Sequence, residues 1–445
     1  MSDVVIAVVG GGSSMFVPGV VRRMLEIDAF DGAELRLMDV DAKRLGVMVD
    51  LASQLARAEG RQLSVTGTTD QRTALDGVTF AIVAISVGGM PAWESDIEIP
   101  ARHGVFMHIA DSIGPGGIFR SLRNTPVVAS VARDLAELSP GAILFNYTNP
   151  ASANAMAMAQ VPGVRSMSLC SCSPFPFQGR WLADLVGVDE SEIVIPTTVG
   201  GINHCTGIMS LRLRDGRDAM PIVRHRDTSE VVAWAIDTFG VIPYCWSHWT
   251  EFFPQLQRLE GAFEGRAQGL PMRYGRHIYD MGDQLGRVRG WEGIAAAWAA
   301  DGGAHRLADL PHGPEDDGIV VVELMDAILA DRQENFIVNV VNHGLIDNLP
   351  STCVVEVPAL VNGEGVHPIG IGPLPTGLAA VLARHAMVQE LTAQAALSGD
   401  LSLLRQAMTA DPLLDATLEP SGIDALMSEM LAANARFLPQ FGQQG

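Results

Sequence analysis

The chain has 445 residues, a formal net charge of −21 at pH 7 and 48% hydrophobic residues. This length allows two packed lobes with separate cores, and the composition is typical of a globular enzyme rather than a disordered chain. The acidic balance disfavours nucleic acid and anionic membrane as partners, because both require a basic face, and no apolar run approaches the roughly 20 residues of a membrane span.

The N-terminus and the cysteines predict a cytoplasmic protein with reduced thiols. The chain opens without a basic stretch and runs directly into an apolar segment, so no leader is expected. The number of cysteines is odd, which argues against a disulfide framework. They are Cys170, Cys172, Cys205, Cys245 and Cys353.

The first part of the chain predicts an α/β fold, with a Rossmann-like doubly wound parallel sheet. Residues 4–9 form a continuous apolar, β-branched run that is typical of a buried parallel strand. Strands and helices then alternate, which favours parallel strands with helical crossovers. Further strands are expected at 35–38, 80–87 and 142–145, and helices at 18–27, 42–58 and 126–138.

The second part predicts an α+β lobe that is rich in helix toward its end. Strands are expected at 197–201, 207–212 and 353–357, and helices at 231–239, 318–331, 374–397, 401–410 and 423–440. We therefore divide the chain into a dinucleotide-binding domain (1–170) and a domain for substrate binding, metal binding and oligomerisation (171–445).

A glycine-rich loop follows the first strand and predicts a dinucleotide site. Its residues are Gly10, Gly11, Gly12, Ser13 and Ser14. Glycines let the backbone approach a pyrophosphate, and the next helix N-terminus stabilises its charge. Asp39 ends the second strand, where a carboxylate accepts hydrogen bonds from ribose and repels a 2′-phosphate, so NAD is favoured over NADP. Met15 replaces the third fingerprint glycine, and a plain strand-to-helix turn is the alternative.

Cys170 and His204 are candidate metal ligands. One thiolate and one imidazole are too few to close a structural site, but they suit an open site in which substrate hydroxyls supply further ligands. A dinucleotide domain joined to such a site indicates redox chemistry on a sugar or hydroxy acid.

Four ordered blocks carry a family resemblance that covers nearly the whole chain. They span residues 111–123, 146–151, 201–216 and 339–358, and include the runs Asn-Tyr-Thr-Asn-Pro and Gly-Ile-Asn-His. Together they resemble glycoside hydrolase family 4, the NAD- and Mn-dependent glycosidases, whose fold is similar to that of lactate and malate dehydrogenases. The resemblance also implies a homo-dimer or homo-tetramer.

The resemblance implies a redox glycosidase, outside the paired-carboxylate rule. NAD removes hydride from C3 of the sugar, the new ketone acidifies the C2 proton, and a base removes that proton while the aglycone leaves from C1. Water then adds and the hydride returns. Mn²⁺ on O2 and O3 would lower the hydroxyl pKa and stabilise the enediolate.

The matching positions suggest roles, each of which competes with a purely structural one. Cys170 and His204 match the metal ligands, although a cysteine buried in the core and a histidine that only supports the fold are more common in proteins. Asn149 matches a contact to sugar hydroxyls, or forms the turn before proline. Asp111 would help at the C2 or O3 proton, or cap a turn. Asn146 would reach the ribose or nicotinamide. Asn203, near the substrate, would orient the groups around the metal or shape its turn.

Several positions depart from the family pattern. Ser171 stands where 6-phospho-α-glucosidases carry a candidate general acid, so another group must assist the leaving aglycone. Trp246 replaces an aspartate before His248, and is expected to stack on the sugar or join an aromatic cluster. Tyr244, Tyr274 and His248 remain candidate bases. His248 and Glu251 would alternatively form a structural pair.

Ser86 replaces an arginine that is frequent in phosphosugar-specific members, and cannot make its bidentate contact. We therefore expect α-glycosides of a sugar with another acidic C6 group, preferably the sulfonate of sulfoquinovose, as in the related NAD-dependent sulfoquinovosidases. An α-galacturonidase or a 6-phospho-α-glucosidase is the alternative within the family. The nominated anion donors are Arg273, Arg276, His277 and His312.

Outside this family, an NAD-dependent 2-hydroxy-acid dehydrogenase is the main rival. It would use the same loop and Asp39 with a histidine–carboxylate relay, and would accumulate NADH. A non-catalytic NAD sensor is a third interpretation.

Overall fold

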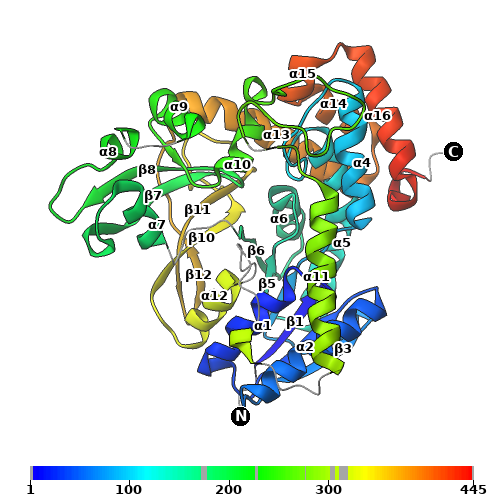
Figure 1. The fold of residues 1–445 in the computed structure, drawn as a ribbon, viewed down its shortest axis with the longest axis vertical. Coiled ribbons are helices and arrows are strands. Elements are labelled where there is room, and N and C mark those ends of the chain that lie inside the picture. Colours follow the sequence, from blue (N-terminus) through cyan, green and yellow to red (C-terminus); the bar gives the residue numbers. More distant parts are fainter. Residues whose placement is uncertain are drawn as a thin grey trace.

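The computed structural model describes residues 4–171, 178–225, 229–275, 277–300, 306–309 and 319–442. Within these ranges, no helix is both long enough and apolar enough to cross a membrane. Figure 1 shows the chain from its N-terminal sheet at the bottom to the C-terminal helices at the upper right.

The N-terminal part is a parallel sheet with the strand order of a Rossmann-like domain. Its strands lie in the order β3-β2-β1-β4-β5-β6, and every neighbouring pair is parallel. They are β1 (Val5–Val9), β2 (Glu34–Met38), β3 (Ser64–Thr68), β4 (Phe80–Val83), β5 (Ile143–Asn146) and β6 (Arg165–Ser168). The connecting helices include α1 (Val17–Glu26), α2 (Ala42–Ala58), α3 (Gln71–Leu75) and α6 (Ala151–Ala159). The expected α/β fold is confirmed.

The pattern of β1 explains why this sheet is covered on both faces. Ile6 and Val8 belong to one apolar cluster, whereas Ala7 and Val9 belong to another. Since successive side chains of a strand point to opposite faces, two separate cores lie on the two sides of the sheet.

Six further strands extend the same sheet in antiparallel fashion. After β6 the order continues β10-β11-β7-β8-β9, with β12 on β11. Their bounds are β7 (Ile193–Ile202), β8 (Cys205–Leu213), β9 (Ile242–Pro243), β10 (Glu334–Val341), β11 (Val354–Asn362) and β12 (Gly365–Pro368). This is the α+β part, and because one sheet runs through both parts, the division at residue 170 stays a prediction.

Helices form a third region beside the sheet. In Figure 1, α4 and the start of α5 lie among α13–α16, away from β7 and β8. The apolar cluster that joins them includes Phe119 and Leu122 of α5, and Leu404 and Leu426 of the C-terminal helices. The bounds are α4 (Gly89–Arg102), α5 (Gly114–Leu138), α7 (Gln178–Val186), α8 (Met220–His225), α9 (Glu230–Phe239), α10 (Trp246–Trp249), α11 (Met281–Ala300), α12 (Ile319–Leu329), α13 (Thr376–Ser398), α14 (Leu401–Ala410), α15 (Pro412–Thr417) and α16 (Pro420–Asn434).

Some predicted bounds were wrong. The strand expected at 80–87 ends at Val83. The Ala84 N–H still bonds to the Val9 carbonyl, but the Ile85 N–H donates to the Thr148 side chain and the Val87 N–H to the Asn124 side chain. The helix expected from Pro126 begins at Gly114, with Pro126 inside it. The helix expected at 423–440 runs over Pro420–Asn434. Strands β3 and β10 and helices α4 and α11 were not anticipated.

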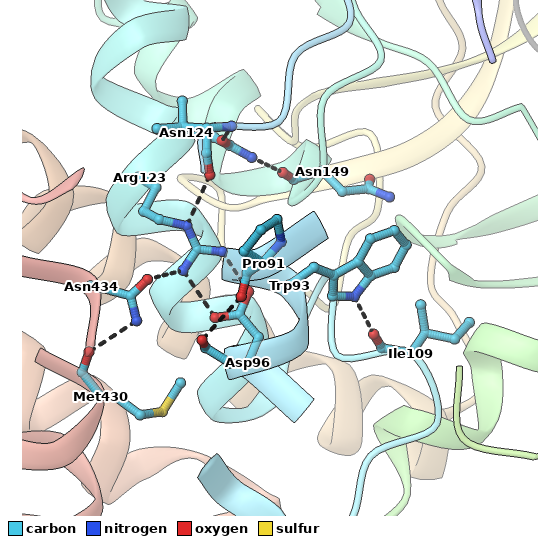
Figure 2. A network of polar contacts seen from close by, with 11 residues as sticks. Pro91, Trp93, Asp96, Ile109, Arg123, Asn124, Asn149, Met430 and Asn434 are labelled. Atoms are coloured by element: carbon cyan, nitrogen blue, oxygen red, sulfur yellow. Dashed lines mark hydrogen bonds and ion pairs between the residues drawn. The ribbon is translucent and has the colours of Figure 1, made fainter. Parts of the chain in front are cut away.

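A buried ion pair fixes α5 against the helices beside it (Figure 2). Arg123 donates to both carboxylate oxygens of Asp96 on α4, to the Asn434 side chain on α16 and to the Val87 carbonyl after β4. Both charged side chains are at most 1% exposed. This pair, here called the Arg123–Asp96 clamp, therefore joins three helices to the loop that follows β4.

The next residue of α5 extends the clamp toward the carboxyl ends of the strands. Asn124 accepts from the Val87 N–H and donates to the Asn149 carbonyl, both at 2.8–2.9 Å. In Figure 2 the Asn149 amide points away from Asn124. Its backbone is thus held from one side while its side chain points to the other.

Candidate active site

The glycine-rich loop packs tightly against two strand ends. Gly10 has a φ of +99°, and a Cβ placed there would lie 2.1 Å from the Ala84 carbonyl oxygen. Gly12 donates its N–H to the Asp39 carboxylate at 3.0 Å. Larger residues would not fit this turn, and Asp39 is placed beside the loop, as the sequence predicts for a ribose contact.

The serines of the loop have local roles. The Ser13 hydroxyl accepts from the Phe16 N–H at the start of α1, and Ser14 is buried. Asn146, at the end of β5, is fully buried, and its side chain bonds to the backbone of Thr148 and the hydroxyl of Ser168. These bonds give Asn146 a structural role inside the Asn-Tyr-Thr-Asn-Pro turn, and its predicted contact to ribose or nicotinamide stays a prediction.

Asn149 connects this turn to Asp111. Its amide donates to the Asp111 carboxylate at 2.8 Å, and the Ser112 hydroxyl donates to the other carboxylate oxygen at 2.7 Å. Burial alone would raise the pKa of Asp111, but His248, His204 and Arg120, together with the Ser112 bond, lower it to about 2. Asp111 is therefore a buried, ionised carboxylate at neutral pH.

Glu251 holds the backbone that leads to Asp111. One Glu251 carboxylate oxygen accepts from the N–H groups of Ile109 and Ala110, at 2.6 and 2.9 Å. Ala110 has a φ of +61°, a conformation that L residues adopt at a cost. Glu251 thus stabilises this turn, and its alternative pairing with His248 stays a prediction.

His204 occupies the turn between β7 and β8, with a φ of +69°. Its Nδ1 lies 2.8 Å from the Ser112 hydroxyl and 3.9 Å from Asp111. The rings of His204 and His248 are in contact, with centroids 3.9 Å apart and planes tilted by 34°.

Two sets of potential ligand atoms share His204. Cys170, His204 and Cys245 form one, and Asp111, His204 and His248 form the other; within each, the donor atoms lie within 4.8 Å of one another. Both predicted ligands, Cys170 and His204, are therefore together in the first set. Cys245 was not anticipated as a member.

A buried carboxylate lies next to this cluster. Glu356 of β11 accepts from Thr206 at 2.6 Å and from Asn339 at 2.9 Å, and burial raises its pKa. Tyr244 and Asn203 face Glu356 without a hydrogen bond of good geometry among the described residues. Burial, followed by the charges of Glu356 and Cys170, raises the pKa of Tyr244 well above its usual range.

The remaining predicted substrate contacts come from segments that follow β9 in the chain. Trp246 begins α10, but its side chain lies outside the described part of the chain, as do Arg276 and His312 entirely. Arg273 is exposed, with its guanidinium over the Tyr274 ring. A Cβ at Gly275 would lie 3.3 Å from His108, so this segment passes beside the residues leading to Asp111.

Sequence reasoning missed Cys245, Ser112 and Glu356 as members of the site. A signal existed for Cys245, since Cys-x-x-His places two donors one turn apart and Cys245 lies 3.2 Å from His248 Nδ1. The other two emerge only when distant segments meet in the fold.

Comparisons with known proteins show which family the chain belongs to. Residues 5–178 match the family 4 glycosyl hydrolase model, and residues 199–414 match the model of the C-terminal domain of that family. An alpha-galactosidase of Rhizobium meliloti (strain 1021) is 28% identical over 99% of this chain and 90% of its own length. An alpha-galacturonidase of Bacillus subtilis (strain 168) is 27% identical, covering 97% of each chain.

A solved structure supports the fold. It is a 6-phospho-alpha-glucosidase from gut microorganisms in complex with NAD and Mn²⁺, with a TM-score of 0.81, 20% identity, and coverage of 98% of this chain and 99% of that one. The family matches together span most of the sequence, and the resemblance inferred from the four blocks is confirmed. The chain belongs to the family 4 glycosyl hydrolases and is a glycosidase.

Proposed function

We propose that this glycosidase uses NAD and a divalent cation, Mn²⁺ or a close substitute, to cleave α-glycosides through transient oxidation at C3. The observation that carries the proposal is a continuous run of contacts from the glycine-rich loop to the cysteine–histidine cluster. Gly10 packs on Ala84, Ile85 bonds to Thr148, Asn149 bonds to Asp111, and Ser112 bonds to both Asp111 and His204. These contacts would bring a nicotinamide site and a metal site next to each other.

The donor groups suit both cofactors. Gly10, Gly12, Ser13, Ser14 and Asp39 would hold NAD, whose nicotinamide supplies a reversible hydride acceptor when bound. Cys170 and His204 would hold the cation, which polarises sugar hydroxyls when bound. The solved 6-phospho-alpha-glucosidase, crystallised with NAD and Mn²⁺, supports this pairing.

Five side chains would handle protons or orient the substrate. Asp111 is ionised at neutral pH, so it suits accepting a hydrogen bond from a sugar hydroxyl. Tyr244 and His248 are the candidate C2 bases; His248 lies 3.9 Å from Asp111. Asn149 would orient the sugar through its amide, and Asn203 has two buried amide atoms without partners among the described residues.

For the substrate, we infer a sugar with an acidic group at C6, with α-sulfoquinovosides as the first choice. Ser86, which is exposed after β4, cannot replace the arginine of phosphosugar-specific members. Arg273 would supply the contact to this anion. It lies shortly before Gly275, which packs beside His108.

An α-galacturonide is the second candidate because a C6 carboxylate is also an anion that an arginine can bind through two hydrogen bonds. The full-length similarity to an alpha-galacturonidase favours it. In either case the protein would act as a homo-dimer or homo-tetramer in the cytoplasm.

The decisive experiment is a panel of nitrophenyl α-glycosides with NAD and Mn²⁺ each added or withheld. The sugars are sulfoquinovose, galacturonate, 6-phosphoglucose, galactose and glucose. Hydrolysis that needs both cofactors, with C2 deuterium exchange in D₂O and no net NADH, supports the mechanism. Steady NADH accumulation would support a dehydrogenase instead, and full activity of the dialysed protein would refute the proposal.

Two variants test the site directly. Cys170→Ser and His204→Ala should each lose most activity while remaining folded by circular dichroism. Full activity in either would remove that residue from the metal site.

A further inference from the structure

Three separate segments deliver donors to one buried point. Cys170 follows β6, His204 forms the β7–β8 turn, and Cys245 directly precedes α10. Each residue is at most 4% exposed, and the donor atoms lie within 4.8 Å of one another. Ligand atoms around a shared ion at bond lengths near 2.1–2.3 Å lie roughly 3.5–4 Å apart, so a small contraction would bring all three onto one cation.

The hydrogen bond of His204 defines which nitrogen remains for a metal. Nδ1 lies 2.8 Å from the Ser112 hydroxyl, whose own proton is donated to Asp111. Nδ1 is therefore the protonated nitrogen, and Nε2 carries the lone pair. A histidine that ligates through one nitrogen and donates through the other to a carboxylate-bound group is the usual arrangement around a metal.

In the competing set of Asp111, His204 and His248, the Asp111 and His248 side chains are better suited to supporting the metal ligands than to binding the metal. Asp111 approaches His204 on its Nδ1 side, at 3.9 Å, and both Asp111 oxygens already accept hydrogen bonds, from Ser112 and Asn149. His248 Nδ1 lies 3.2 Å from the Cys245 sulfur. A thiolate at Cys245 would accept a hydrogen bond from this ring, which would support a metal-bound sulfur.

We propose that Cys245 is a third protein ligand, completing a site of two sulfurs and one nitrogen with Cys170 and His204. The assignment of Cys170 and His204 as metal ligands rests on the proposed function, whereas the role of Cys245 is inferred from the geometry of this chain. Both thiols release their protons to solvent when the cation binds. Two thiolates make the site soft, so Zn²⁺ and Co²⁺ should bind more tightly than Mn²⁺.

The test uses the full-length protein, stripped of metal by dialysis against a chelator and titrated with Co²⁺. Sulfur-to-cobalt charge-transfer absorption should appear in the wild type and fall by half in Cys245→Ser and in Cys170→Ser. Cys353→Ser is the matched control, because Cys353 is also a buried cysteine but lies outside both donor sets; its absorption should equal that of the wild type. In competition, Cys245→Ser should weaken Zn²⁺ binding at least about 10-fold.

Unchanged absorption and unchanged Zn²⁺ affinity in Cys245→Ser would overturn the proposal. Should that variant fold poorly, X-ray absorption on Co²⁺-loaded wild type decides the matter, since two sulfur neighbours support it and one refutes it. These readouts need no substrate turnover. A protein that shows two sulfur neighbours but no NAD-dependent hydrolysis would therefore refute the proposed function while leaving the third ligand in place.

Discussion

Two carboxyl groups with opposite pKa shifts flank the strained turn at residues 109–111. Burial opposes ionisation of Asp111, but nearby His248, His204 and Arg120 outweigh it and lower the pKa of Asp111 to about 2. Burial and the charge of Asp111 raise the pKa of Glu251 to about 7. Such separation lets one group stay ionised while its neighbour carries a proton near neutral pH. Glu251 thus supports the turn in a partly protonated state.

The raised pKa of Glu251 predicts a pH-dependent stability. An unfolded glutamate ionises near its usual value, so between about pH 4.5 and 7 the folded state holds a proton that the unfolded state has released. Stability of the metal-free protein should fall through this window, by on the order of 3 kcal/mol, and level off above it. Urea unfolding at pH 5, 6, 7 and 8 measures the slope.

Glu251→Gln is the comparison, since an amide keeps an oxygen for the two backbone N–H groups but does not titrate. Its stability should vary less with pH than that of the wild type across this window. Parallel curves for both proteins would exclude Glu251 as the titrating group.

At the scale of elements, the turn after β1 depends on a single backbone conformation. Gly10→Ala would place a Cβ 2.1 Å from the Ala84 carbonyl in a left-handed residue. We expect a loss of about 1–3 kcal/mol of stability and NAD binding weakened at least about 10-fold, measured by calorimetry. Gly46→Ala is the control: Gly46 is exposed in α2 with nothing within 4 Å, so stability should stay equal or rise by up to about 1 kcal/mol. Equal NAD affinity in both variants would contradict the assignment of the loop.

The Arg123–Asp96 clamp predicts strong coupling between α4 and α5. Removing one partner leaves a buried charge, so Arg123→Met or Asp96→Leu should each lose about 3–5 kcal/mol. The double variant buries no charge and should lose less than the sum of the single losses. Urea denaturation of the four proteins gives the coupling energy; additive losses would mean that the clamp does not act as a pair.

Elements with strong local patterns could be predicted from the sequence, whereas those defined by tertiary contacts could not. The run before Gly10, and helix α2 with its Asp41 cap, carry their own signals. By contrast, α5 begins in Gly-Pro-Gly-Gly, which resembles a loop, and is helical there because Ile118 and Phe119 pack into the C-terminal helices. The polar residues of β10 gave no strand signal, since the Asn339 amide N–H group donates to Ser168 and Glu356, which lie on other strands.

The residues of the candidate site divide in the same way: some stand in recognisable sequence motifs, and others are brought together only by the fold. Cys170, His204, Asp111 and Asn149 stand in motifs that a single sequence displays. Ser112 bonds to a partner more than 90 residues away, and the partners of Glu251 are more than 140 residues away, so only the fold brings these groups together. Sequence spacing alone carries no signal for such contacts.

Over the whole molecule, the three proposed metal donors come from both parts of one sheet. Cys170 follows the last parallel strand, whereas His204 and Cys245 belong to the antiparallel part. In the sheet, β10 pairs with β6 at one position, Asn339 opposite Ser168, and β11 pairs with β7 at one position, Glu356 opposite Gly201. A cation held by all three donors therefore bridges a narrow junction in the sheet.

Because unfolding separates these donors, a cation that binds the folded protein should stabilise it by mass action. At a free Zn²⁺ or Mn²⁺ concentration about 100 times the Kd, the free energy of unfolding should rise by about 2.7 kcal/mol. Urea unfolding with and without metal measures this, and Cys353→Ser, altered outside the donor sets, should keep the full increase. Cys170→Ser should lose most of it. An equal increase in Cys170→Ser would mean that the stabilising cation binds elsewhere, and not at the junction between the two parts of the sheet.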